Sequence, residues 1–204
     1  MPLGGFQTKT VKVAFESPSG HAFNVPPLLN IERQCRSNWC WAAVALSIAR
    51  ARQVAAFTSQ QELVWAVLDE LGLTADLDQA ECMRPECNPS ASGPSDKMLD
   101  VIPLEFAGLP SPQVFDRPID EQTLIDELKA GRPVCLVINW KGGGSHAIAV
   151  VGGATDASGE AVFFPGDPML SGVEPHTYEN LIGHYRSGAG SQFSGRAVKA
   201  YVLT

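Results

Sequence analysis

Cys40 stands in the segment Gln-Cys-Arg-Ser-Asn-Trp-Cys-Trp-Ala-Ala, residues 34–43, where a polar loop meets an Ala-rich stretch. The stretch from about residue 39 to 56 contains no Pro or Gly and predicts a helix, so Cys40 falls in its first turn. Unpaired backbone N–H groups and the helix dipole favour negative charge there, which makes a thiolate available as a nucleophile. Gln34 precedes the helix and can present its amide N–H beside the backbone N–H of Cys40, forming an oxyanion hole.

A thiolate nucleophile needs an imidazole partner, and the chain has four histidines. His146 lies between the loop Gly-Gly-Gly-Ser, residues 142–145, and an apolar stretch that predicts a buried strand. On spacing alone, a loop histidine that caps a hairpin explains His146 equally well. His21 lies in a Pro-rich stretch, while His176 and His184 lie in polar sequence, so we expect these three to be solvated surface groups. The glycine run does not match a phosphate-binding loop, because Ser-His and a strand follow it instead of Lys-Ser and a helix.

A third group should orient the imidazole by accepting its Nδ1–H. Asp167 is favoured because it follows the predicted strand 161–164 and precedes a proline, and strand ends often carry site residues. Asp156 lies in a segment with turn composition and is the weaker candidate. The remaining acidic residues after the histidine rank lower, because they open a strand or lie in polar sequence: Glu160, Glu174 and Glu179.

The other four cysteines have simpler explanations. Cys35–Cys40 and Cys82–Cys87 share one spacing, which would suit a four-thiolate zinc site only loosely, since no tight C-x-x-C pair is present. We therefore expect no metal and no cofactor. Cys135 lies in an apolar run and is predicted to be a small buried hydrophobe, and Cys35 is likewise expected to be a packing residue. Cys82 and Cys87 flank a Pro-containing loop and would either pair in an oxidising compartment or stay free.

Hydrophobic periodicity predicts an α+β chain in which helices come first and strands afterwards. Ser59 with Glu62 three residues later forms a predicted capping box for the second helix, and Asp120 is the predicted N-cap of a later one. The predicted helices span about 39–56, 59–72, 94–103 and 120–131. The predicted strands span about 10–15, 133–140, 147–151, 161–164 and 197–203, and residues 17–30 form an extended connector.

These motifs resemble the papain-like cysteine proteases. The family pattern of a Gln, five residues, then Cys-Trp-Ala is matched by Gln34 and by residues 40–42, and its His-Ala, apolar strand, Val-Gly pattern is matched by residues 146–152. The resemblance implies that Cys40 is the nucleophile, His146 the general base and acid, and Gln34 the oxyanion-hole donor. It implies a cysteine endopeptidase with a Cys-His-Asp triad and a protein or peptide as substrate.

The resemblance also implies a two-lobe fold, with an N-terminal helical lobe over about residues 30–131 and an antiparallel β lobe over about 132–204. Residues 1–29 would be an extension or an edge strand. The chain departs from the eukaryotic type, because Asp167-Pro168 stands where papain has Asn before Ser-Trp, and Ser-Asn-Trp at 37–39 replaces the usual Gly-Ser before the nucleophile. Together with Cys-Asn-Pro at 87–89, these features are more similar to the compact bacterial group that includes a plant-pathogen effector protease.

Two alternatives remain. A leader-peptidase-like or transglutaminase-like acyl-transfer enzyme is less favoured, because Trp41 follows the nucleophile instead of Gly and Ile148 stands where His-Ala-Trp would place Trp. A non-catalytic binding module is disfavoured, because every expected residue is present. The net charge of -7 argues against nucleic acid as a partner, and no apolar run approaches membrane-spanning length. No apolar block of signal-peptide type opens the chain, so we expect a cytoplasmic protein or one exported without a conventional signal peptide.

Overall fold

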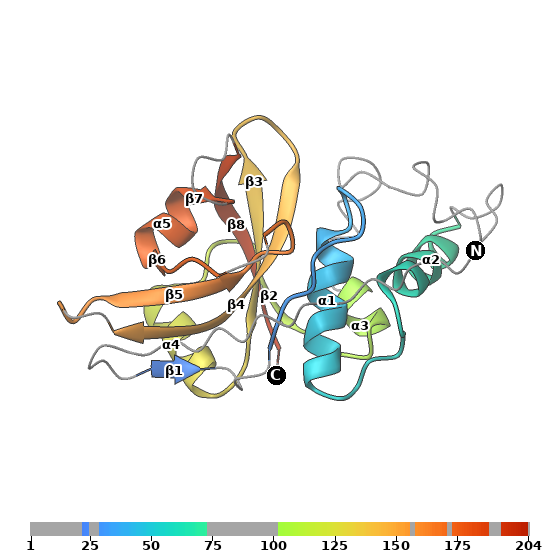
Figure 1. Ribbon diagram of the computed structural model, residues 1–204, viewed down its shortest axis with the longest axis horizontal. Coiled ribbons are helices and arrows are strands. Elements are labelled where there is room, and N and C mark those ends of the chain that lie inside the picture. Colours follow the sequence, from blue (N-terminus) through green and yellow to red (C-terminus); the bar gives the residue numbers. More distant parts are fainter. Residues whose placement is uncertain are drawn as a thin grey trace, which may run out of the picture.

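The computed structural model describes residues 22–24, 29–72, 102–155, 158–170, 173–187 and 193–203. The chain has an α+β architecture in which helices α1 to α3 lie beside one antiparallel sheet and α4 and α5 lie at its other side (Figure 1). The helices are α1 (Cys40–Ala51), α2 (Gln60–Glu70), α3 (Ile102–Phe106), α4 (Glu121–Lys129) and α5 (Tyr178–Gly183). None of the helices in these ranges is long and apolar enough to span a lipid bilayer.

The sheet has the strand order β2-β8-β3-β4-β5-β6, with every neighbouring pair antiparallel. Two further strands join it, since β1 pairs with β4 and β7 pairs with β8. The strands are β1 (Ala22–Asn24), β2 (Gln113–Phe115), β3 (Val134–Trp140), β4 (Ser145–Thr155), β5 (Ala161–Gly166), β6 (His176–Thr177), β7 (Tyr185–Arg186) and β8 (Ser194–Val202).

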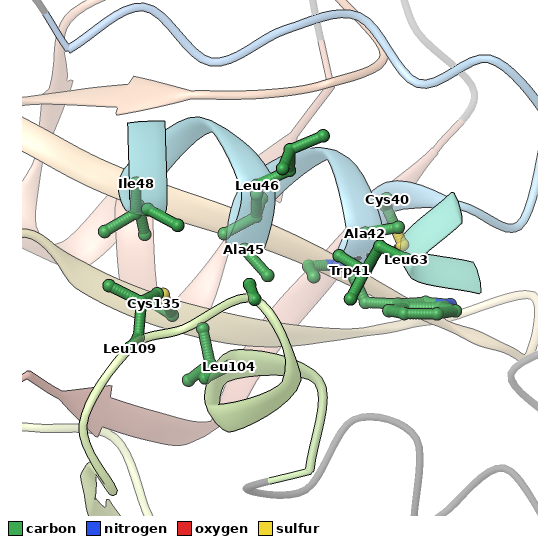
Figure 2. Close-up of a cluster of buried hydrophobic side chains, with 14 of the residues drawn as sticks. Cys40, Trp41, Ala42, Ala45, Leu46, Ile48, Leu63, Leu104, Leu109 and Cys135 are labelled. Carbon is green, nitrogen blue, oxygen red and sulfur yellow. Dashed lines mark hydrogen bonds between the residues drawn. The ribbon is translucent and has the colours of Figure 1, made fainter. Parts of the chain in front are cut away.

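Alternation along β3 divides the core between the two faces of the sheet. Cys135 and Val137 pack in a cluster with the buried residues of α1 and α2 (Figure 2). Val134, Leu136 and Ile138 pack in a second cluster with α4 and α5 on the opposite face. Successive side chains of a strand point to opposite faces, so the apolar residues 134–138 contribute to both clusters.

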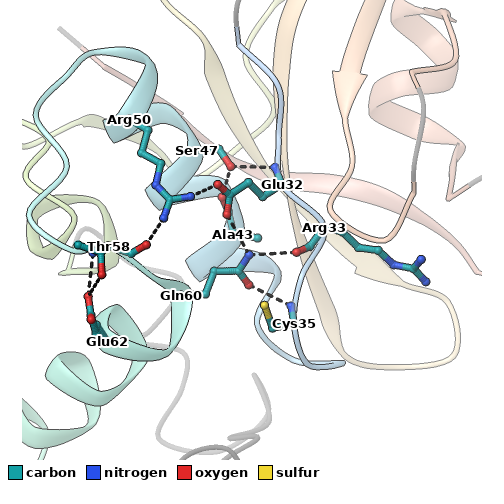
Figure 3. Close-up of polar contacts among 9 residues, drawn as sticks. All are labelled: Glu32, Arg33, Cys35, Ala43, Ser47, Arg50, Thr58, Gln60 and Glu62. Atoms are coloured by element: carbon teal, nitrogen blue, oxygen red, sulfur yellow. Dashed lines mark hydrogen bonds and ion pairs between the residues drawn. The ribbon is translucent and has the colours of Figure 1, made fainter. Parts of the chain in front are cut away.

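The helix boundaries follow local signals. Ser59 accepts a hydrogen bond from the backbone N–H of Glu62 at 3.2 Å, and Asp120 accepts from the backbone N–H of Thr123 at 2.9 Å, as their predicted N-cap roles require. The Glu62 carboxylate bonds to the backbone N–H and hydroxyl of Thr58, one residue before the cap, at 2.8 and 2.7 Å (Figure 3). The capping interaction of Glu62 is therefore displaced by one residue from the predicted box.

Pro103 was predicted to lie beyond the end of a helix, but it lies in the first turn of α3, which spans Ile102–Phe106. Proline is tolerated in the first turn of a helix, where its missing N–H would have no intrahelical partner. Residues 94–101 lie outside the described part of the chain, as do the predicted strand 10–15 and most of the connector 17–30. Within that connector, residues 22–24 form β1, which pairs with Gly152–Ala154 of β4.

Candidate active site

Cys40 is the first residue of α1 and is 2% exposed. The N-cap residue Trp39 provides no side-chain cap to this helix, and its first turn carries no acidic residue. The helices α2 and α4 differ, because the side chains of Ser59 and Asp120 cap them. The first backbone N–H groups of a helix have no intrahelical acceptor, so the start of α1 places partial positive charge beside the Cys40 side chain.

The segment that leads into Cys40 is fixed by side chains of two helices (Figure 3). Gln60 of α2, which is buried, accepts from the backbone N–H of Cys35 and donates to the carbonyl of Arg33, both at 3.0 Å. Ser47 of α1 accepts from the backbone N–H of Glu32 at 2.9 Å. These bonds hold residues 32–35 against the helices and so set the path of the chain into α1.

His146 lies near the start of β4, and Asp167 follows the end of β5; both side chains are buried. Nε2 of His146 lies 2.7 Å from Oδ1 of Asp167. The structure therefore brings the predicted pair together, but through the other ring nitrogen from the one expected. Which nitrogen meets the carboxylate depends on where β4 and β5 place the two Cα atoms. With Nε2 on Asp167, Nδ1 is the nitrogen left for the thiol.

The side chains of Cys40 and His146 lie together near the start of β4. The Cys40 sulfur accepts a hydrogen bond from the backbone N–H of Ala147 at 3.4 Å, and its side chain contacts the His146 imidazole. The indole of Trp140 on β3 stacks against the His146 imidazole, with ring centroids 5.3 Å apart and planes at 21°. The thiol, imidazole and carboxylate thus come from three separate elements.

The ionisation of the pair follows from these contacts. Burial works to lower the pKa of His146, but the hydrogen bonds and charges of Asp167 and Cys40 outweigh it and raise the pKa to about 9. Burial works to raise the pKa of Asp167, yet the hydrogen bond and positive charge of His146 hold it below its ordinary value. The arrangement therefore favours an imidazolium against a carboxylate at neutral pH.

Gln34 lies on the same loop as the nucleophile but directs its amide at that loop. Its Nε2 donates to the carbonyls of Arg36 at 2.8 Å and Ser37 at 2.6 Å, and its buried Oε1 has no partner among the described residues. The backbone N–H of Gln34 donates to the carbonyl of Pro168 at 2.9 Å, which ties the nucleophile loop to the Asp167 turn. An oxyanion-hole role, which stays a prediction, requires one of the two loop bonds to give way to a substrate oxygen.

A glycine allows the two segments to approach this closely. A Cβ at Gly166 would lie 2.4 Å from Cγ1 of Ile31, well inside van der Waals contact. Position 166 is therefore a glycine because the segment that leads to Cys40 passes close to it at Ile31.

The weaker candidates for the triad were other acidic residues and histidines. Glu160, Glu174, Glu179 and His184 are exposed, and Asp156 and His21 lie outside the described residues. His176 was expected on the surface, but it is half-buried: its ring lies 5.2 Å from that of Tyr185, and burial lowers its pKa. Its polar sequence neighbours gave no sign of this packing.

Among the cysteines, Cys135 is buried as predicted, whereas Cys35, also expected to pack, is exposed with a free thiol. Cys82 and Cys87, expected either to pair or to stay free, lie outside the described residues, and so does this half of the disfavoured zinc pattern. Within the described ranges, no group of three or more His, Cys, Asp or Glu side chains is arranged to hold a metal.

Two residues that the sequence did not single out complete the surroundings of Asp167. The hydroxyls of Tyr185 and Ser187 both donate to its Oδ2, at 2.9 and 2.8 Å. The only local signal is the alternation Tyr-Arg-Ser, which puts two hydroxyls on one face of a short strand.

A family model described as papain-like cysteine protease AvrRpt2 matches residues 19–181. No match is found among curated proteins. The matched region includes the segments that carry Cys40, His146 and Asp167.

Proposed function

This chain belongs to the papain-like cysteine proteases of the AvrRpt2 family, a bacterial effector family of hydrolases, and we propose that it is an endopeptidase that works through a thioester on Cys40. The observation that carries the proposal is the contact between the buried Cys40 side chain, in the first turn of α1, and the His146–Asp167 pair. The substrate is a protein or peptide, as for any protease.

In the proposed reaction, the Cys40 thiolate attacks the carbonyl carbon of the scissile peptide, and the carbonyl oxygen takes up the negative charge. The tetrahedral intermediate collapses as the C–N bond breaks and the His146 imidazolium protonates the leaving amine. The resulting thioester is attacked by water, from which His146 now removes a proton. The C–S bond then breaks, which releases the carboxylic acid and restores the thiolate–imidazolium pair.

Asp167 orients and charges the imidazole throughout, while the backbone N–H of Cys40 and the amide of Gln34 stabilise the oxyanion. We further propose that α1 to α3 and the sheet behave as two lobes with the substrate between them. In support, Cys40 comes from the helical side, whereas His146 and Asp167 come from the sheet side.

The proposal is tested by trapping the acyl-enzyme. The protein is mixed with an activated peptide ester, quenched in acid within milliseconds, and digested for mass spectrometry. We expect an acyl adduct on the peptide that contains Cys40, and no adduct in the Cys40→Ala variant.

The matched control is Cys35→Ser, which removes an exposed thiol five residues away and should leave the adduct and the hydrolysis rate unchanged. An adduct on Cys35 alone would contradict the proposal. If the acyl group passed mainly to an added primary amine rather than to water, a transglutaminase-like transfer would replace hydrolysis as the reaction.

A further inference from the structure

The carboxylate of Asp167 receives four hydrogen bonds, two on each oxygen. Oδ1 meets Nε2 of His146 at 2.7 Å and accepts from the backbone N–H of Met169 at 2.8 Å. Oδ2 accepts from the hydroxyls of Tyr185 and Ser187. A carboxylate has about four lone-pair sites, so this set fills it. Each of the four partners contributes a hydrogen, so the surroundings are complementary to an acceptor.

The two hydroxyls reach Asp167 because of strand geometry. Tyr185 opens β7 and Ser187 follows its last residue, so both side chains lie on one face while Arg186 between them is exposed. Tyr185 is fully buried and Ser187 is 6% exposed. The Tyr185 ring is also held by Trp140, at a centroid distance of 6.3 Å, so the direction of its hydroxyl is fixed by packing.

We propose that Tyr185 and Ser187 are positioning residues that select an ionised carboxylate at position 167 and aim it at His146. The inference rests on the proposed function, since it concerns the same site. An asparagine at this position could offer its carbonyl oxygen to His146, but its amide N–H₂ would then face both hydroxyls. The hydroxyl hydrogens would lose their acceptor inside the protein, which is costly.

The ionisation states agree with this assignment. The pKa of Asp167 is lowered although burial opposes it, and hydrogen bonds from His146, Met169 and Ser187 contribute to the lowering. Burial, followed by the charge of Asp167, raises the pKa of Tyr185, so its hydroxyl keeps its proton at neutral pH.

Among the described residues, the titratable group of His176 also lies close to Asp167 and Tyr185. The half-buried His176 lies against the Tyr185 ring and senses Asp167 and the exposed Glu174, but burial lowers its pKa and leaves it uncharged at neutral pH. His146 is therefore the cation paired with Asp167 at neutral pH.

The test measures the acid titration of Asp167 through the low-field Nε2–H proton resonance of His146, identified by its loss in His146→Gln. Each of Tyr185→Phe and Ser187→Ala removes one hydrogen bond to the charged form. We expect each to move the midpoint of the titration upward by about one pH unit. The control Tyr178→Phe removes a hydroxyl that donates to the carbonyl of Ile119 at 2.7 Å, and it should leave the midpoint unchanged.

A second arm measures kcat/KM for Asp167→Asn in the wild-type background and in the Tyr185→Phe/Ser187→Ala background. The loss caused by Asp167→Asn should be about tenfold smaller without the hydroxyls, because the amide then meets no opposing donors. Unmoved midpoints in both single variants, or an equal loss in both backgrounds, would overturn the inference.

The two proposals can fail separately. If the wild-type protein hydrolysed no peptide, the proposed function would be wrong, while the NMR titration would still decide the role of the hydroxyls. If Tyr185→Phe did not fold, Ser187→Ala alone would give the same answer.

Discussion

Cys40 and Cys135 are two thiols in the same hydrophobic cluster, with exposures of 2% and 5%, yet their surroundings differ (Figure 2). Cys135 lies in β3 between Ala149 of β4 and Tyr201 of β8. Burial raises its pKa to about 12, and the distant positive charge of Arg52 offsets this only in part. Cys40 instead receives the backbone N–H of Ala147 and contacts an imidazole.

The difference shows that burial alone does not decide the reactivity of a thiol. An apolar site disfavours the thiolate, whereas N–H groups and a cation placed around an equally buried sulfur favour it. In this protein, the starts of α1 and β4 place a backbone N–H group and an imidazole beside Cys40. Cys135 instead lies in the middle of β3, between Ala149 and Tyr201. The following predictions test this contrast.

The largest effect, on the reactivity of Cys40, is expected from removing the His146 imidazolium. In His146→Ala, alkylation of Cys40 by iodoacetamide at pH 6.5 should slow by about 100-fold, because the nearby positive charge that favours the thiolate is lost. The site of labelling is read by mass spectrometry. The exposed Cys35 should react at the same rate in both proteins, and Cys135 should stay unlabelled in both. Equal labelling of Cys40 in the two proteins would remove the contrast between the thiols.

A smaller effect is expected on the pH dependence of the free energy of unfolding. The pKa of His146 in the folded protein, about 9, lies above its ordinary value of 6.5, so the folded state binds the proton more tightly. The resulting stabilisation is complete below pH 6.5 and is lost as the pH rises towards 9, with a slope of up to about 1.4 kcal/mol per pH unit. Urea unfolding at several pH values measures this slope.

His146→Gln should flatten that slope, whereas His184→Gln, which changes an exposed histidine, should preserve it. The value of kcat/KM should fall about tenfold per unit above pH 9, because the imidazolium that protonates the leaving amine is lost. A slope that survived in His146→Gln would assign the proton to another group.

The smallest effect is expected at the unreactive thiol. Cys135→Ala removes a buried sulfur from β3 and should lower the free energy of unfolding by about 1 kcal/mol through the small cavity it leaves. Because Cys135 has no part in the proposed chemistry, kcat/KM should stay within about twofold of wild type. A large loss of activity with unchanged stability would contradict its purely structural role.

The sequence predicted the parts of the site that carry local signals. Cys40 could be placed in the first turn of a helix from the break between polar loop and Ala-rich run, and His146 at a strand start from the glycine loop before it. The nitrogen that meets Asp167 was predicted wrongly, since it depends on the separation of β4 and β5, which no local pattern encodes. Tyr185 and Ser187 were missed because a two-residue strand is too short for periodicity to reveal.

The strand β4 has a neighbour on each side over most of its second half, whereas its first residues, 145–148, which include His146, pair with β3 alone. On one side β3 pairs with residues 145–150 and β1 with 152–154, and on the other β5 pairs with residues between 149 and 155. Amides of the half that is paired on both sides open only in the rarest, near-global fluctuations, so they should be among the last to exchange with deuterium. Because His146 directly precedes this half on the same strand, we expect the imidazole to move with the sheet, and the opening that admits a polypeptide to separate α1 and its cysteine from it.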